Sequence, residues 1–94
     1  MVQQDAFMAI ADFNRRQLLE ELRRGPRTVN ELASGLPVSR PAVSQHLKVL
    51  LDCGLVVVRR EGTKRYYSVS TAGFLKLNIW LDQFWDEADT LRGD

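Results

Sequence analysis

The sequence predicts a mainly α-helical domain that carries one small β-hairpin, and two observations support this prediction. Apolar residues recur at helical spacing in several segments along the chain. A short β-branched run at residues 55–58 is followed by turn residues and by an alternating segment at residues 65–69, as expected for two paired strands. The chain of 94 residues is long enough for one core, so we expect a single domain over residues 1–94.

The composition is that of a globular protein, with 45% hydrophobic and 27% charged residues. No apolar run approaches the roughly 18 residues of a membrane helix, and the first residues lack the basic and apolar layout of a secretory signal. The single cysteine excludes an internal disulfide framework. We therefore expect a protein of the reducing cytoplasm, associated with the nucleoid if it binds DNA.

The charges are distributed unevenly although the net charge is only +1. Residues 1–70 hold 11 Lys and Arg against 7 Asp and Glu, whereas residues 71–94 hold 2 against 5. A basic body with an acidic last segment is expected if one face of the protein meets phosphate.

The first two predicted helices cover residues 4–12 and residues 14–24. Asn14 is a candidate N-cap for the second, whose buried stripe would be Leu18, Leu19 and Leu22, and residues 25–26 (Gly-Pro) would end it. The arginine pairs at residues 15–16 and 23–24 are interpreted as solvated charges. A phosphate contact by one of these arginines is the alternative.

Two short helices follow, at residues 28–36 and 39–53. Thr28 and Glu31 have the spacing of a capping box, and Ser39 can cap the next helix. Because the turn between them is tight, residues 28–54 predict a helix-turn-helix, whose second helix ordinarily enters the DNA major groove. We call this second helix the recognition helix.

The recognition helix has two faces. Val43, Leu47 and Leu50 fall within roughly 60° of one another and form an apolar stripe. The opposite face consists of short, neutral or basic side chains with one acid: Pro41, Ser44, Gln45, Lys48 and Asp52. Such a face suits a DNA groove; an ordinary amphipathic surface helix is the alternative.

The hairpin at residues 55–69 would form a basic wing beside the recognition helix. Gly54 precedes it, at a position where a side chain is expected to obstruct packing. Strand alternation places Tyr67 and Val69 inward and Tyr66 and Lys64 outward. Near the tip lie Arg59, Arg60, Lys64 and Arg65. We expect phosphate contacts there; the alternative is that these charges only keep an exposed hairpin soluble.

The last predicted helix, residues 71–91, is the longest. An apolar seam recurs in steps of three and four residues, through Phe74, Leu77, Leu81, Phe84, Ala88 and Leu91. Ile79, Trp80 and Trp85 lie off this seam, and a small domain cannot cover so much of one helix. The pattern therefore predicts dimerisation through this helix; the alternative is that it completes the core of a monomer.

Several strings resemble the ArsR family of bacterial winged-helix repressors. The most specific is residues 39–50 (SRPAVSQHLKVL) followed by residues 54–56 (GLV); residues 11–16, 29–33 and 60–67 add to it. The resemblance implies a homodimer built from the first and last helices. It also implies binding to an imperfect inverted repeat and repression by blocking polymerase, often at the protein's own operon.

Many members of this family sense metals, and here the sequence departs from them. Residues 31–36 (ELASGL) lack the Cys-x-Cys pair of one sensor type, and the last helix has Asp82, Asp86 and Glu87 but no histidine. Carboxylates alone are poor ligands for soft metals. Asn14 stands where the family usually has Thr. We expect no metal and no cofactor, and the inducer is unknown.

The expected site residues follow from these patterns and from the resemblance. DNA contacts are expected from Ser39, Arg40, Pro41, Ser44, Gln45, His46 and Lys48 of the recognition helix and from Arg60, Thr63, Lys64 and Arg65 of the wing. The dimer interface is expected to contain Phe7, Ile10, Phe74, Leu77, Leu81, Phe84, Trp85 and Ala88.

Individual roles can be assigned by chemistry. Gln45 can pair with adenine, and Arg40 can reach guanine or a phosphate. Lys48 would act as a point charge on the DNA backbone. His46 is interpreted as packed or phosphate-touching rather than metal-binding, and Cys53 as a small apolar filler, with a redox thiol as the alternative.

Enzymatic function finds no support, because the sequence contains no nucleophile–base set and no phosphate-binding glycine loop. We therefore predict a sequence-specific DNA-binding repressor that acts as a homodimer. The alternative is a winged helix used for protein contact without DNA, since a fold does not determine function.

Overall fold

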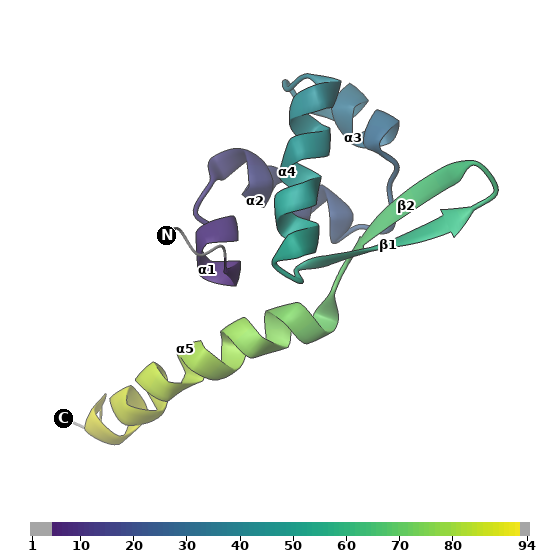
Figure 1. The fold of residues 1–94 in the computed structure, drawn as a ribbon. Helices are drawn as coiled ribbons and strands as arrows, with labels where there is room; N and C mark the ends of the chain where they lie inside the picture. The colour runs from purple at the N-terminus through teal and green to yellow at the C-terminus, as the bar shows by residue number, and fades with distance from the viewer. Residues whose placement is uncertain (1–4, 93–94) are drawn as a thin grey trace.

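The computed structural model describes residues 5–92, with side chains for residues 5–85, as five helices and one hairpin (Figure 1). The helices are α1 (Ala6–Ala9), α2 (Phe13–Leu22), α3 (Val29–Gly35), α4 (Arg40–Asp52) and α5 (Thr71–Arg92). The strands β1 (Val56–Glu61) and β2 (Lys64–Val69) precede α5. This order confirms the predicted fold class. Within the described residues, no helix has the length and apolar character that crossing a membrane requires.

The start of α2 differs from the prediction. Its N-cap is Asp12 rather than Asn14, and the backbone N–H of Arg15 donates to Asp12 Oδ1 at 3.0 Å. Both residue types cap helices well, but a helix that begins at Phe13 already contains Asn14. The hydrogen bond from the Arg15 amide holds the pKa of the Asp12 carboxyl below its ordinary value.

The helix-turn-helix forms through the predicted caps. Thr28 Oγ1 accepts from the backbone N–H of Glu31 at 3.2 Å, and Glu31 Oε1 accepts from the backbone N–H of Thr28 at 2.9 Å. Ser39 Oγ accepts from the backbone N–H of Ala42 at 3.2 Å and starts α4. The capping box and the Ser39 cap are both confirmed.

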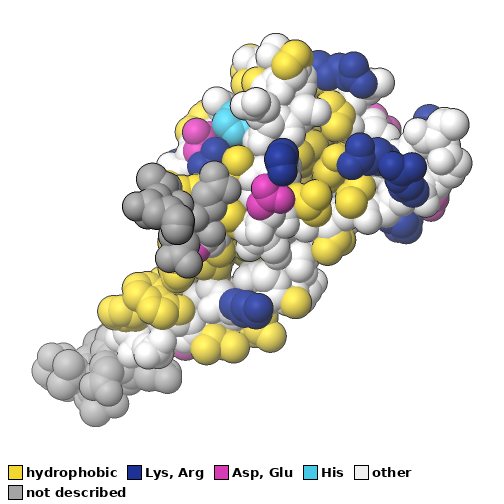
Figure 2. Space-filling model, in the orientation of Figure 1, with side chains coloured by type: hydrophobic (Ala, Val, Ile, Leu, Met, Phe, Trp, Pro, Cys, Tyr) yellow, Lys and Arg dark blue, Asp and Glu magenta, His cyan; other side chains and the backbone are white. Residues whose placement is uncertain are grey.

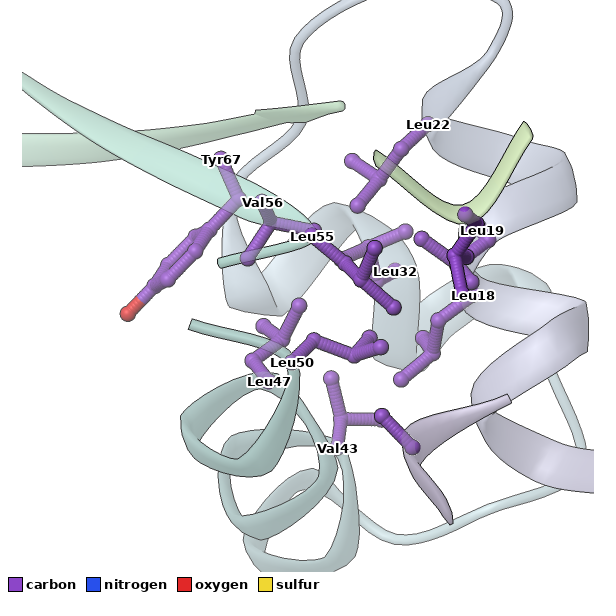
Figure 3. Packing of buried hydrophobic residues seen from close by; sticks show 12 residues of the cluster. Leu18, Leu19, Leu22, Leu32, Val43, Leu47, Leu50, Leu55, Val56 and Tyr67 are labelled. Atoms are coloured by element: carbon purple, nitrogen blue, oxygen red, sulfur yellow. The ribbon is translucent and has the colours of Figure 1, made fainter. Parts of the chain in front are cut away.

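The core lies between α2, α3, α4 and the base of the hairpin, and Figure 3 shows its side chains converging from these elements. The apolar stripe of α4 is fully buried, since Val43, Leu47 and Leu50 each expose 0% of their surface. Leu18 and Leu32 pack against it from α2 and α3. The predicted inward stripes of α2 and α4 are confirmed.

The wing is a two-stranded antiparallel hairpin at the predicted place, with strands longer and a turn shorter than predicted. It turns at Gly62 and Thr63, and Gly62 has φ +62°, which fits a two-residue turn with glycine first. Tyr67 also pairs with Arg27 through two backbone hydrogen bonds of 3.0 and 2.8 Å. This pairing attaches the hairpin to the segment between α2 and α3, which an isolated hairpin needs for stability.

The segment after α4 and the start of α5 approach each other at two glycines, Gly54 and Gly73, and the role of Gly54 differs from the prediction. A Cβ on Gly54 would meet no atom within 4 Å, so the expected obstruction there is wrong; Gly54 is required because its φ is +79°. The close approach belongs to Gly73. A Cβ on Gly73 would overlap the carbonyl oxygen of Gly54 and lie 2.9 Å from its carbonyl carbon.

The helix α5 leaves the rest of the fold after its first turns and projects from it (Figure 1). Leu77 is buried in the core and Phe74 packs at its edge, whereas Leu81, Phe84 and Trp85 are exposed. The molecule is consequently elongated, with extents of 55 × 29 × 25 Å.

We expect Gly73→Ala to destabilise the protein by about 1–3 kcal/mol, because backbone atoms of α4 and α5 must move apart. Thermal unfolding followed by circular dichroism would measure this as a Tm lowered by at least several degrees. Gly35→Ala is the matched control, since a Cβ there meets nothing within 4 Å. The same Tm for both variants would show that α5 can shift freely on α4.

Candidate nucleic-acid interface

A groove of about 450 Å³ lies between the wing, the start of α3 and the first half of α4. It is lined by Thr28, Val29, Asn30, Glu31, Arg40, Ser44, Thr63, Lys64, Arg65 and Tyr67. The fold therefore brings together residues from three segments that are well separated in sequence. In Figure 2, the largest gathering of Lys and Arg side chains on the visible face lies over the wing.

Five of the predicted DNA-binding residues line this groove together. Arg40 and Ser44 come from α4, and Thr63, Lys64 and Arg65 come from the tip of the wing. The outer face of α4 is also oriented as predicted, because Pro41, Gln45 and Lys48 are exposed beside the groove. One helix face and one hairpin tip thus form a continuous polar surface.

The remaining predicted residues lie differently. The Ser39 hydroxyl is engaged as the α4 cap. Lys48 Nζ lies 3.1 Å from Asp52 Oδ2, in an exposed pair that a competing phosphate can replace at little cost. Arg60 faces Arg65 across the hairpin and is exposed without lining the groove.

The wing separates its charges by strand alternation. Paired residues share one face, so Arg60 and Arg65 lie on the side of Tyr67, whereas Arg59 and Lys64 lie with Tyr66 on the other. Lys64 nevertheless lines the groove, because it lies next to the turn at the tip of the wing. Arg59 forms an ion pair of 2.9 Å with Glu61, and its guanidinium lies 5.9 Å from the centre of the Tyr66 ring. Arg59 therefore belongs to the outer face of the wing.

His46 points away from the groove and toward α2. It is half-buried, and its Nδ1 lies 3.4 Å from the Arg15 guanidinium. Arg15 also donates to the carbonyl oxygens of Ala9 at 2.7 Å and Met8 at 3.2 Å. The interpretation of Arg15 as a solvated charge is wrong, because its side chain joins the end of α1 to the recognition helix.

Cys53 is half-buried at the end of α4 and packs against the core. Burial raises the pKa of its thiol, and the nearby Asp5 and Asp52 carboxylates act in the same direction. A protonated thiol is a poor nucleophile, which favours the role of apolar filler over a redox role. Within residues 5–85, no cluster of three or more His, Cys, Asp or Glu side chains could hold a metal.

The comparison with known proteins identifies the family. Residues 12–58, which run from the α2 cap into β1, match the family described as bacterial regulatory protein, arsR family. The chain is also 52% identical over 85 residues to the HTH-type transcriptional regulator Rv2034 of Mycobacterium tuberculosis, covering 90% of this chain and 79% of that protein. The chain belongs to the ArsR family.

Two further similarities extend over most of the chain. The transcriptional repressor SdpR of Bacillus subtilis is 31% identical over 85 residues, covering 90% of this chain and 94% of that protein. The solution structure of a homodimeric winged helix-turn-helix DNA-binding domain, Mb0332 of Mycobacterium bovis, has 28% identity and a TM-score of 0.69, covering 93% and 92% of the two chains. This ArsR-family chain is thus a DNA-binding transcriptional regulator, a class that is not an enzyme family.

Part of the groove was not predicted from the sequence. Tyr67 was expected to point inward, and its ring is buried, but Figure 3 shows the hydroxyl directed away from the other buried side chains. No hydrogen bond to the Tyr67 hydroxyl is found within the described residues. Every side-chain oxygen that is fully buried there has a hydrogen-bond partner, so this hydroxyl is not fully buried. Because Tyr67 lines the groove, its hydroxyl reaches solvent on that side.

The start of α3 was also missed, since Thr28, Asn30 and Glu31 line the groove. The capping box explains Thr28 and Glu31 through local structure alone, so no sequence pattern assigned them to a binding surface. Their position follows only from the packing of α3 beside the wing.

Proposed function

We propose that this protein represses transcription as a homodimer that binds an inverted-repeat DNA operator, in which each protomer reads one half-site. The observation that carries the proposal is the groove in which α4 and the wing tip present polar and basic side chains side by side. An α-helix fits the major groove of B-DNA, and a wing beside it can hold the adjacent phosphates.

The positions of the side chains support a division of roles. Gln45 and Arg40 are exposed in the first half of α4, where recognition helices contact bases. Ser44, Lys48 and the wing residues Arg60, Thr63, Lys64 and Arg65 would contact phosphates, together with the α4 cap residue Ser39. Pro41 would lie against a thymine methyl group. His46 would not contact DNA but would hold α4 against α2 through its contact with Arg15.

The homodimer is supported by an exposed aromatic cluster between α1 and α5. Phe7 and Trp80 lie edge to face with ring centres 4.9 Å apart, and Trp80 and Phe84 have centres 4.6 Å apart. All three remain exposed, and they are continuous with Leu81 and Trp85. A patch of this kind on a monomer is typical of a protein–protein interface.

The proposed interface differs in part from the predicted one. Leu77 exposes only 6% of its surface and belongs to the core of its own protomer, so we leave it out and add Trp80. Ile10 and Phe74 are half-buried at the edge of that core, so we leave them out of the proposed interface as well. Ala88 lies outside the residues whose side chains are described.

Binding to the DNA upstream of the chain's own coding sequence tests the function. We expect the affinity to fall roughly a thousandfold between 50 and 200 mM salt if about six phosphates are neutralised. A titration followed by fluorescence anisotropy measures this slope. A flat salt response, or no binding, would favour a protein-contact module instead.

Lys64→Ala and Lys76→Ala form a matched pair for the same titration. Lys64 lines the groove, whereas Lys76 is exposed on α5. Loss of one phosphate contact should reduce the salt slope by about 1 in Lys64→Ala only. Equal effects would mean that the wing acts through overall charge alone.

We extend the proposal to the Tyr67 hydroxyl as a phosphate donor. Tyr67→Phe keeps the buried ring and removes only the donor, so we expect an unchanged Tm and an affinity about tenfold lower, as for a hydrogen bond to a charged group. Tyr66→Phe, on the outer face of the wing, should bind like the unchanged protein. If the two variants bind equally, the Tyr67 hydroxyl does not touch DNA.

The dimer interface is tested by Leu81→Glu, which places a charge on the exposed seam of α5. We expect monomers in sedimentation velocity and loss of operator binding, because an unpaired buried charge destabilises an interface strongly. Leu75→Glu is the control, since Leu75 is also exposed but lies about 120° from Leu81 around α5. Dissociation by Leu75→Glu but not by Leu81→Glu would place the interface on the face of α5 that carries Leu75.

A further inference from the structure

A second hollow, of about 420 Å³, lies where α5 and the end of β2 meet α2, and it shares no residue with the DNA groove. Its floor is apolar and consists of Ile10, Leu19, Val69 and Phe74. Leu19 is buried, whereas the other three are half-buried and face the opening. Hollows of this volume with an apolar lining are typical of sites for small organic ligands.

The rim of the hollow is charged and comes from one face of α2. Arg16, Glu20 and Arg23 follow one another at helical spacing and give the rim a net charge of +1. One guanidinium N–H of Arg16 donates a hydrogen bond to the carbonyl oxygen of Ile10 at 2.7 Å, which holds the Arg16 side chain at the rim.

Arg23 is the more available of the two cations. It pairs with Glu20 at 3.0 Å, but both side chains are more than half exposed, and such surface pairs contribute little stability. An incoming anion can therefore engage the Arg23 guanidinium at small cost. The planar guanidinium also matches a carboxylate through two parallel hydrogen bonds.

We propose that this hollow is a binding site for an amphipathic carboxylate, with an apolar chain on the floor and the carboxylate at Arg23 and Arg16. The apolar floor offers no ligands to a metal ion or a sugar. A second copy of the chain is a poorer occupant, because its apolar seam would bury the three charged rim residues without partners.

The position of the hollow also indicates how binding would act on DNA. Val69 ends the wing and Phe74 lies in the first turn of α5, so one ligand would contact both the wing and the helix proposed to dimerise. A ligand that prefers one angle between them shifts that equilibrium. We assign it the effect of weakening operator binding; this regulatory part rests on the proposed function, whereas the binding part does not.

Sodium decanoate, kept below its micelle concentration, is the probe for the binding part. Isothermal titration calorimetry on the full chain should show saturable binding of decanoate and at least about tenfold weaker binding of decanol and decylammonium, because both lack the anionic group. Equal binding of decanoate and decylammonium would overturn the proposal, since it would show apolar association without charge recognition.

Arg23→Gln and Arg24→Gln provide matched variants. The two arginines are neighbours, and each pairs with a glutamate three residues earlier, but only Arg23 lines the hollow. We expect Arg23→Gln to weaken decanoate binding about tenfold and Arg24→Gln to leave it unchanged. Equal affinities of the two variants would overturn the assignment of the carboxylate to Arg23.

Two further measurements test the occupant and the regulation. Ile10→Trp should fill the hollow and abolish decanoate binding at an unchanged Tm. If decanoate binds the Leu81→Glu monomer but not the unchanged dimer, a second copy covers the hollow and the proposal is wrong.

Decanoate should also release operator DNA from the unchanged protein but not from Ile10→Trp. Decanoate binding without DNA release would overturn the regulatory part alone. Absence of DNA binding before decanoate is added would instead count against the proposed function, and the calorimetry would still decide the binding part.

Discussion

Val43, Leu47 and Leu50 bury one stripe of α4 completely, and the direction of the opposite face follows from that burial. Burial of each aliphatic side chain contributes about 1.5–3 kcal/mol to the free energy of unfolding. Rotation of α4 about its axis would expose these side chains and lose several kcal/mol of that free energy. Gln45 and Arg40 are therefore held outward by side chains that never approach DNA. The reading face is rigid because the hidden face is apolar.

The same helix, α4, contacts the elements proposed to dimerise at two places. On its flank, His46 contacts Arg15, whose guanidinium is bonded to the carbonyls that end α1. At its C-terminus, Gly54 lies against the backbone of α5 at Gly73. A displacement of α1 or α5 must therefore reach α4 through a charged contact and a backbone contact.

The sequence predicted the features that depend on local pattern. The stripe of α4, the Thr28 capping box and the Ser39 cap all rest on residues within four or five positions of one another, and the structure has each of them. Within a helix turn, spacing determines which side chains meet.

Features that depend on distant segments were not predictable in this way. Asp12 rather than Asn14 caps α2 because the helix begins at Phe13, and Arg15 faces carbonyl oxygens at the end of α1 that sequence spacing does not place near it. A clash was expected at Gly54 when it belongs to Gly73, because the two meet only after α5 packs on α4. The positions of the Tyr67 hydroxyl in the groove and of Arg23 at the rim of the second hollow likewise depend on the packing of several elements against one another.

Acidic residues near the proposed DNA surface raise an apparent conflict with phosphate binding, and the hydrogen bonds resolve it. Glu31 lines the groove, but its carboxylate accepts from the Thr28 amide at the start of α3, where the helix dipole favours negative charge. Glu61 is paired with Arg59 on the outer face of the wing, and Asp52 is paired with Lys48.

Four basic residues of the same surface differ from the acidic ones in their pairing. Over the part of the chain whose side chains are described, no ion pair is found for Arg40, Arg60, Lys64 or Arg65. The acidic side chains of this surface thus have local partners, whereas no ion pair is found there for these four cations. The field at this surface is consequently more positive than the net charge of +1 suggests.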